Sequence, residues 1–521
     1  MSFPARFFWW RRRFPRRGAN PAMLLGVALG LVAPACAEPL SFRVTLDPAF
    51  QGEPYTGRVY VIVSGNAGRE PRRDITNWFS PPYVFERDVN HAPPGEPIVL
   101  SETATGFPKP LTDLPVGTYH VQAVARRSLD HPVAGSGPGD LYSETRALDL
   151  DSASTGPIEL RLDRVVGQRP FEETPRTKLV EMVSPSLSAF HGREYKIRAA
   201  VVLPVGWKDD PKSVYPVLYM IPGFGGGHEM ARFIERSVGV DSPGAGVMIV
   251  VPDPRCHLGH SVFADSANNG PWGWALVHEL MPEIERRFHG AQSGSRRYVT
   301  GVSSGGWSSL WLQITYPEEF NGCWSHTPDP VDFRDFQRIN LYEPGVNMYV
   351  DGQGHRRPLA RQGAEPVLWY DDFVHAEDVA GPGGQIHSFE AVFSRRASEA
   401  GPELLFDRKT GAVHTDVAKT WERYDIRLIL ERHWDTLGPK LAGKLHIYGG
   451  EFDTFYLEGS VRLLGESLAK LGSDAEVKII PGMGHGLYLP AMATMFKTII
   501  ENLAKHAPDG DKSIDGDDGG P

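Results

Sequence analysis

The chain has few cysteines, no excess of positive charge and no long apolar run, and each shortage excludes a class of protein. Three cysteines in 521 residues cannot build a disulfide-stabilised scaffold. A formal net charge of −10 argues against a general nucleic-acid binder. No apolar run approaches the roughly 20 residues that a membrane-spanning helix needs. The composition, 41% hydrophobic and 23% charged, is instead typical of a globular protein large enough to bury its own core.

The first 37 residues have the order of parts of a signal peptide. Six arginines without any acidic residue come first, an apolar stretch runs from Ala22 to Ala33, and Ala35-Cys36-Ala37 fits a cleavage site. The arginine cluster also resembles a twin-arginine signal. We therefore expect a periplasmic or secreted protein rather than one held by an N-terminal membrane anchor. Cleavage would lower the formal charge from −10 to −16, because the only charged residues in the removed segment are six arginines.

Residues 38–166 predict an immunoglobulin-like β-sandwich, because short alternating segments are separated by turns rich in glycine and proline. We expect strands at Ser41–Leu46, Arg58–Ser64, Pro97–Leu100, Thr118–Ala125, Thr145–Leu150 and Ile158–Val165. This region holds no catalytic grouping, which favours a packing or docking module over a carbohydrate- or surface-binding one. Residues 167–177 are interpreted as a linker.

Residues 178–507 predict an α/β fold, a doubly wound and mostly parallel sheet. Near-continuous apolar runs such as Val217–Ile221 indicate strands buried on both faces, and amphipathic segments such as Trp274–Phe288 indicate the covering helices. Residues 328–440 interrupt this rhythm and are interpreted as an insertion that could form a cap. The acidic, glycine-rich tail 508–521 is expected to be disordered.

The motif Gly301-Val302-Ser303-Ser304-Gly305 follows an apolar strand and precedes a helix. Glycines two residues before and after a serine allow the sharp strand-to-helix turn of a nucleophile elbow. The helix N-terminus also points backbone N–H groups at negative charge that develops there. Ser303 is therefore the candidate nucleophile.

A serine needs a base and an acid that orients the base. His485 lies in a glycine-rich loop after the apolar run Glu476–Ile480, and Asp453 follows the preceding strand, Leu445–Tyr448. The order Ser303, Asp453, His485 is that of α/β-hydrolases. Glu451 is the alternative acid.

The developing oxyanion needs two backbone donors. One is the N–H of Ser304, the residue after the nucleophile. The other is assigned to Phe224, with Gly225 as the alternative, in the glycine-rich loop after Val217–Ile221.

Several of these segments together resemble the putative-esterase (esterase D-like) family. The resemblance rests on the run before the glycine-rich turn at 222–227, the helix around 278–285, the elbow, and Tyr316-Pro317 with Phe320. The family includes S-formylglutathione hydrolases, feruloyl and acetylxylan esterases, enterochelin esterases and mycolyl transferases. The resemblance implies an α/β-hydrolase fold and acyl transfer to water through Ser303, His485 and Asp453. Pro222 departs from the family, in which many members have histidine before glycine.

Two further residues are candidates for the substrate pocket, Trp272 in a loop and His326 at a strand end. Cys256-His257-Leu258-Gly259-His260 carries ligand-type side chains, but nothing else supports a metal site and none is predicted. The expected chemistry needs no cofactor.

The sequence therefore predicts an exported serine hydrolase that cleaves carboxylic esters through an acyl-enzyme. Feruloyl or acetyl esters on polysaccharide, or siderophore esters, are the favoured substrates, whether small molecules or polysaccharide-linked. We expect no nucleic-acid partner and no stable membrane span, and the sequence carries no signal for the oligomeric state. The alternatives are a non-catalytic binding protein on a hydrolase scaffold and an acyltransferase.

Overall fold

The computed structural model describes residues 39–50, 53–128, 130–151, 156–210, 212–397 and 401–505. The predicted signal peptide at 1–37 and the predicted tail at 508–521 lie outside these residues. The described residues belong to one compact unit. Within them, none of the helices has the length and hydropathy to span a bilayer.

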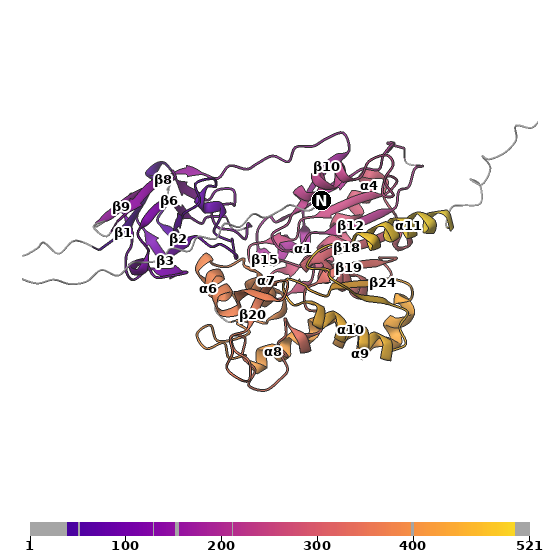
Figure 1. Ribbon diagram of the computed structural model, residues 1–521. Helices are drawn as coiled ribbons and strands as arrows, with labels where there is room; N and C mark the ends of the chain where they lie inside the picture. Colours follow the sequence, from indigo (N-terminus) through magenta and orange to yellow (C-terminus); the bar gives the residue numbers. More distant parts are fainter. Residues whose placement is uncertain are drawn as a thin grey trace, which may run out of the picture. The chain divides into compact units, whose positions relative to one another are not determined.

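The N-terminal region is a nine-stranded, almost wholly antiparallel β-domain (Figure 1). Its strands are β1 (Ser41–Leu46), β2 (Tyr55–Ser64), β3 (Tyr83–Ala92), β4 (Ile98–Leu100), β5 (Thr105–Phe107), β6 (Gly117–Ala125), β7 (Leu141–Ser143), β8 (Arg146–Leu150) and β9 (Pro157–Val165). They form one continuous ladder in the order β4-β1-β9-β7-β6-β2-β3-β5, with β8 on β6. Phe42 of β1 nevertheless stacks on Phe85 of β3, so the ladder folds back on itself around a shared core. The two layers of this β-domain therefore belong to one hydrogen-bonded sheet, whereas the two layers of an ordinary β-sandwich are separate sheets.

The second region is built on an eight-stranded sheet in the order β10-β11-β13-β12-β18-β19-β24-β25. These strands are Thr177–Val183, Lys196–Val202, Met248–Pro252, Val217–Ile221, Arg297–Ser303, Cys323–Pro328, Leu445–Gly450 and Glu476–Ile480, in that order. The ladders from β13 to β25 are parallel, and β11 runs against its neighbours on both sides. This strand order and the single reversed strand make it an α/β-hydrolase fold.

Helices cover both faces of the sheet, as near-continuous apolar strands require. Alternate residues of β11 show this, since Val201 belongs to one apolar cluster and Val202 to the other. One face packs on α4 (Met281–Phe288), α5 (Ser304–Thr315), α9 (Ile426–Leu441) and α10 (Glu458–Lys470), and the other packs on α2 (Ala231–Ser237) and α11 (Leu489–Lys505). The predicted helix Trp274–Phe288 is α3 (Trp272–Ala275), a π-helical turn (Leu276–Leu280) and α4 in succession.

The segment 328–440 lies between β19 and β24 and shares the core of the sheet. It contains the hairpins β20 (Pro358–Gln362) with β21 (Glu365–Trp369) and β22 (Arg396–Ala397) with β23 (Gly401–Pro402). Its helices are α6 (Tyr370–Ala380), α7 (Gln385–Phe393), α8 (Thr415–Trp421) and most of α9. Phe333 and Phe393 of this segment pack in the same cluster as Trp307 of α5, so the insertion is fused to the hydrolase core.

Candidate active site

The turn from β18 into α5 forces Ser303 into an unusual backbone conformation. Its φ of 59° and ψ of −126° lie where residues with a Cβ are rare, at a cost of about 1–3 kcal/mol. The flanking glycines make room for the turn. A Cβ on Gly301 would lie 2.2 Å from the carbonyl oxygen of Gly305, and one on Gly305 would lie 2.1 Å from that of Ile221. The strained turn therefore places a half-buried serine hydroxyl at the carboxyl edge of the sheet.

His485 and Asp453 meet where the loops after β25 and β24 converge. Asp453 Oδ2 lies 2.8 Å from His485 Nδ1, and Asp453 Oδ1 accepts a hydrogen bond from the Phe455 backbone N–H at 2.8 Å. Asp453 is fully buried, so its carboxylate is fixed on both oxygens. The alternative acid, Glu451, is exposed and accepts from the Gly482 N–H instead. The geometry brings Asp453, not Glu451, to the histidine.

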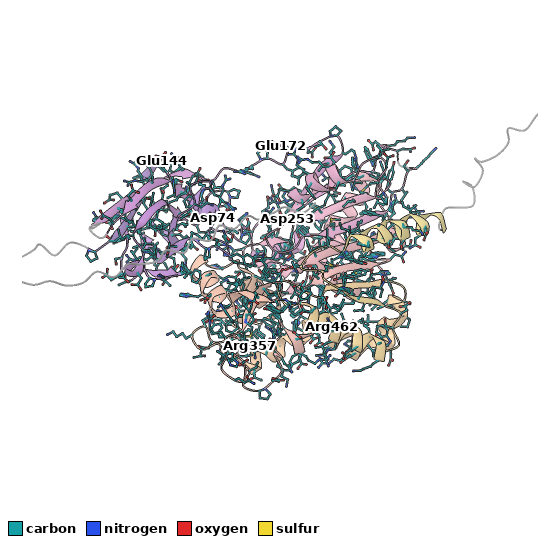
Figure 2. The ribbon with its side chains drawn as sticks, viewed as in Figure 1. Asp74, Glu144, Glu172, Asp253, Arg357 and Arg462 are labelled. Atoms are coloured by element: carbon teal, nitrogen blue, oxygen red, sulfur yellow. The ribbon has the colours of Figure 1, made fainter. Side chains whose placement is uncertain are left out.

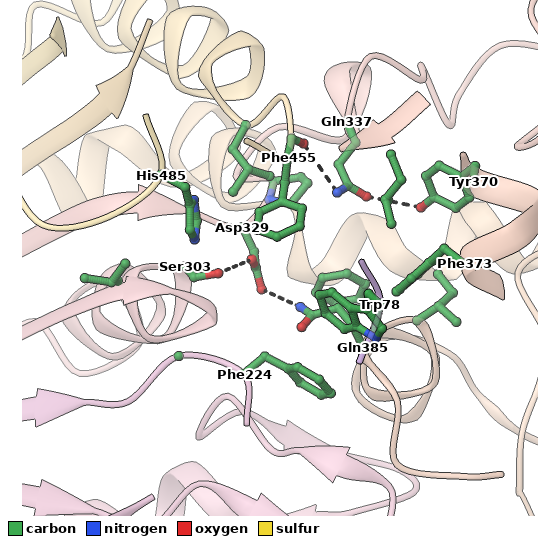
Figure 3. A pocket seen from close by; sticks show the side chains of 17 residues that line it. Trp78, Phe224, Ser303, Asp329, Gln337, Tyr370, Phe373, Gln385, Phe455 and His485 are labelled. Carbon is green, nitrogen blue, oxygen red and sulfur yellow. Dashed lines mark hydrogen bonds between the residues drawn. The ribbon is translucent and has the colours of Figure 1, made fainter. Parts of the chain in front are cut away.

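Ser303 and His485 open into one cavity of about 340 Å³ (Figure 3). Gly223 and Phe224 of the loop after β12 line the same cavity, and a Cβ on Gly223 would lie 3.4 Å from Ser303 Cβ. The loop thus passes directly against the elbow, where a backbone donor is needed. Most other lining side chains are apolar or aromatic: Trp78, Val302, Pro330, Leu359, Tyr370, Phe373, Ile386, Phe389, Phe455 and Leu457. Nine of the 17 lining residues come from the insertion.

A second carboxylate, Asp329, lies beside Ser303, and the sequence pattern did not identify it. Ser303 Oγ donates to Asp329 Oδ1 at 3.2 Å, and Ser304 Oγ donates to Oδ2 at 2.5 Å. Gln385 Nε2, at the start of α7, donates to the same Oδ2 at 3.2 Å. Burial raises the pKa of Asp329 to about 6, although the hydroxyl hydrogen bonds and the nearby His485 oppose the rise. The available signal was its position immediately after β19, at the carboxyl edge of the sheet.

The structure corrects the pocket role expected of Trp272 and His326, because neither is among the described residues that line the cavity. Trp272 is 2% exposed and packs edge-on against Tyr195 within the core. His326 is fully buried, stacks on Tyr448 and accepts from the Tyr488 N–H, and burial lowers its pKa to about 4. Both are buried side chains outside the cavity that Ser303 and His485 line.

The segment around Cys256 is held by hydrogen bonds of its own. His260 Nε2 lies 2.9 Å from the Pro222 carbonyl, and Cys256 is a buried free thiol, as is Cys323. Asp253, labelled in Figure 2, pairs with His228 at 2.9 Å and with Arg255 at 2.8 Å, which holds its pKa far below the usual range. Among the described residues, no group of three or more His, Cys, Asp or Glu side chains is placed to hold a metal ion.

Part of the chain that carries this site is similar to a known family. Residues 190–387 match the family model described as "Putative esterase". The matched segment carries Phe224, Ser303, Asp329 and Gln385, and it ends before Asp453 and His485. Two esterases from two strains of Mycobacterium tuberculosis are each 30% identical over 138 residues, which is 26% of this chain and 30% of theirs. The chain therefore spans about a third of the length of the curated relatives that it matches.

Solved structures of esterases superpose loosely on the chain. A ferulic acid esterase of Anaeromyces mucronatus is 14% identical with a TM-score of 0.32, and covers 64% of this chain and 92% of its own. An S-formylglutathione hydrolase of Agrobacterium tumefaciens is 17% identical with a TM-score of 0.37, and covers 63% of this chain and 95% of its own. The strand order of the chain itself shows the fold.

Proposed function

We propose that the chain is an exported serine esterase that cleaves carboxylic esters through Ser303, His485 and Asp453. The observation that carries the proposal is the buried 2.8 Å contact between Asp453 and His485, in the same cavity as a strained serine elbow. The family match of residues 190–387 supports the same reaction class. Export is supported by the signal-like order of residues 1–37.

Each residue of the triad has one task in this reaction. His485 takes the Ser303 proton through Nε2 while Ser303 Oγ attacks the ester carbonyl. Asp453 fixes the imidazole tautomer through Nδ1 and stabilises the charge that the ring acquires. In the resting geometry Ser303 Oγ donates to Asp329, so the hydroxyl must first rotate toward the imidazole. Such loose serine–histidine geometry is common before substrate binds.

The backbone N–H groups of Ser304 and Phe224 hold the oxyanion of the tetrahedral intermediate. The alcohol leaves with the proton from His485, which leaves the acyl group on Ser303. A water molecule, deprotonated by His485, then releases the acid. The largely apolar cavity favours an ester with an apolar group. Feruloyl and siderophore esters, which carry aromatic groups, fit this lining better than an acetyl ester does, and the feruloyl ester is the polysaccharide-linked candidate.

Purified chain lacking residues 1–37 is assayed with p-nitrophenyl acetate and a fluorophosphonate probe. We expect Ser303→Ala to abolish both turnover and labelling, because the hydroxyl is the nucleophile. Ser308→Ala, on the same helix and with its hydroxyl on the Ser304 carbonyl, is the matched control and should be labelled like the wild type. Labelling or turnover that persists in Ser303→Ala would refute the proposal.

A further inference from the structure

We propose that the N-terminal β-domain is part of the active site. Its Trp78 forms one wall of the cavity beside Ser303 and makes the enzyme select esters with a flat, apolar acyl group. This inference rests on the proposed esterase function and adds to it a substrate class and a specificity-determining residue. It also goes beyond the expectation that this domain is a packing or docking module.

Polar contacts hold the β-domain against the insertion. Two side chains of β2 donate to the end of α6, Arg58 Nη1 to the Asp378 carbonyl at 2.8 Å and Tyr60 Oη to the Ala380 carbonyl at 2.9 Å. Arg126, directly after β6, donates to the Pro382 carbonyl at 2.6 Å. All three acceptors lie within five residues of one another, just before Gln385 of the cavity. The β-domain is therefore fastened to the segment that leads into the site.

An apolar cluster and a close backbone approach make the same junction tight. Ile75, Tyr60 and Val124 of the β-domain share a buried cluster with Val379 of α6. In the loop between α6 and α7, a Cβ on Gly383 would lie 2.3 Å from the Pro132 carbonyl oxygen, and its φ is +113°. A side chain at Gly383 would thus push the two parts of the chain apart.

Trp78 belongs to the β-domain loop between Arg73 and β3. Its ring stacks on Phe224 with centroids 5.7 Å apart and planes inclined by 16°. It also meets Phe373 of α6 and Phe455 edge-on, at 5.1 and 6.1 Å. Aromatic pairs in these arrangements attract each other beyond simple burial. Trp78 therefore completes an aromatic wall whose other members come from three separate segments of the hydrolase region (Figure 3).

This wall is directly connected to the reacting groups. Phe455 lies edge-on to the His485 ring at 5.1 Å, and Phe224 is the assigned oxyanion residue. Trp78 is thus one ring away from the base and in direct contact with a ring of the oxyanion loop. A flat acyl group bound to Ser303 would find aromatic surface on several sides, whereas an acetyl group has little area to bury. The contribution of Trp78 should therefore grow with the size of the acyl group.

The test compares acyl groups on one leaving group, p-nitrophenyl acetate and p-nitrophenyl 3-phenylpropanoate. We expect Trp78→Ala to lower kcat/KM for the phenylpropanoate about 10-fold, mainly through KM, as the loss of one aromatic contact and its buried area implies. Acetate turnover should change less than about 2-fold on the same argument. Trp78→Phe should recover part of the loss. Phe79→Ala, at the neighbouring 55% exposed ring that does not line the cavity, is the matched control and should be unchanged.

Boronic acids give a second measurement that needs no turnover. The inhibition constant of 2-phenylethylboronic acid should rise about 10-fold in Trp78→Ala, while that of methylboronic acid stays constant. The inference would be overturned if Trp78→Ala lowered kcat/KM and weakened boronic acid binding equally for small and large acyl groups, or changed neither. If Trp78→Ala does not fold, Trp78→Leu, which keeps apolar volume but not the flat ring, is judged by the same two ratios. Failure of the esterase proposal would look different, since the wild type would then neither hydrolyse p-nitrophenyl acetate nor react with the fluorophosphonate probe.

Discussion

The segments after β19 and after β24 each carry a buried carboxylate at the same edge of the sheet, but they surround it differently. Asp453, after β24, receives a backbone N–H on one oxygen and the His485 imidazole on the other. Asp329, after β19, receives two serine hydroxyls and the Gln385 amide. Among the described residues, no arginine or lysine side chain donates to either carboxylate, so position relative to His485 separates their roles.

The comparison teaches that a carboxylate near a serine nucleophile is not by that fact its catalytic acid. The acid must bond Nδ1 of the base, since only there can it fix the tautomer that accepts the serine proton at Nε2. Asp453 meets this condition, whereas Asp329 bonds the nucleophile itself. A buried carboxyl of the second kind costs stability when it ionises, as its raised pKa of about 6 indicates.

The largest expected effect separates the two acids by the same substitution. Asp453→Asn should lower kcat on p-nitrophenyl acetate about 10³- to 10⁴-fold, because the amide favours the wrong imidazole tautomer. Asp329→Asn should lower it less than about 10-fold, because it leaves the Asp453–His485 pair intact. Steady-state kinetics at pH 7.5 measure both. Glu451→Gln changes an exposed carboxylate two residues from Asp453 and controls for the loss of a charge near the loop. It should leave kcat nearly unchanged.

A result in which Asp329→Asn is the more damaging variant would reverse the comparison and make Asp329 the catalytic acid. A large loss in Glu451→Gln would instead restore the alternative that the sequence left open.

The second effect concerns stability and its dependence on pH. The folded pKa of Asp329, about 6, lies above its ordinary value of 3.8, so the folded state binds the proton more tightly than the unfolded state. Its stabilising contribution is complete below pH 3.8 and is lost as the pH rises through 6. The shift of about two units corresponds to roughly 3 kcal/mol lost at neutral pH.

Asp329→Asn removes this penalty but also disturbs three hydrogen bonds. We therefore expect its Tm to exceed that of the wild type at pH 7.5, and the advantage to shrink or disappear at pH 5. Differential scanning calorimetry at the two pH values measures it. A Tm below that of the wild type at pH 7.5, or an advantage independent of pH, would contradict the assignment of a raised pKa.

The two carboxylates also differ in how far the sequence alone could predict their place in the site. Asp453 follows the predicted strand Leu445–Tyr448, which the structure extends to Gly450, so chain order alone placed it near His485. Asp329 follows a strand, Cys323–Pro328, whose polar residues Ser325 and His326 hide the apolar pattern. All six side chains of that strand are buried, and burial of polar groups follows from the neighbouring elements rather than from local periodicity.

Trp78 illustrates a stronger limit of sequence reasoning. Six of the nine strands of the β-domain were expected near their observed positions, but β3, β5 and β7 were not. The β3 sequence carries four charged or amide side chains among its last seven residues, so its alternation is weak. The loop before it reaches the cavity through contacts with α6, more than 290 residues later in the chain. Local pattern describes each element but not which loop of one domain meets the site of another.

The smallest expected effect tests how the hydroxyl of Ser304 serves Asp329. Ser304→Ala deletes the 2.5 Å hydrogen bond to Asp329 Oδ2 but keeps the backbone N–H assigned to the oxyanion. A hydrogen bond to a charged group contributes about 1.5–3 kcal/mol, and this one stabilises the ionised form, so its loss raises the pKa of Asp329 further. The Tm should therefore fall more at pH 7.5 than at pH 5, while kcat falls less than about 5-fold because the oxyanion donors remain.

Ser308→Ala loses a hydrogen bond to a neutral carbonyl, and its Tm change should not depend on pH. Equal pH dependence in the two variants would show that Asp329 does not ionise in this range, and the contrast with Asp453 would then rest on position alone.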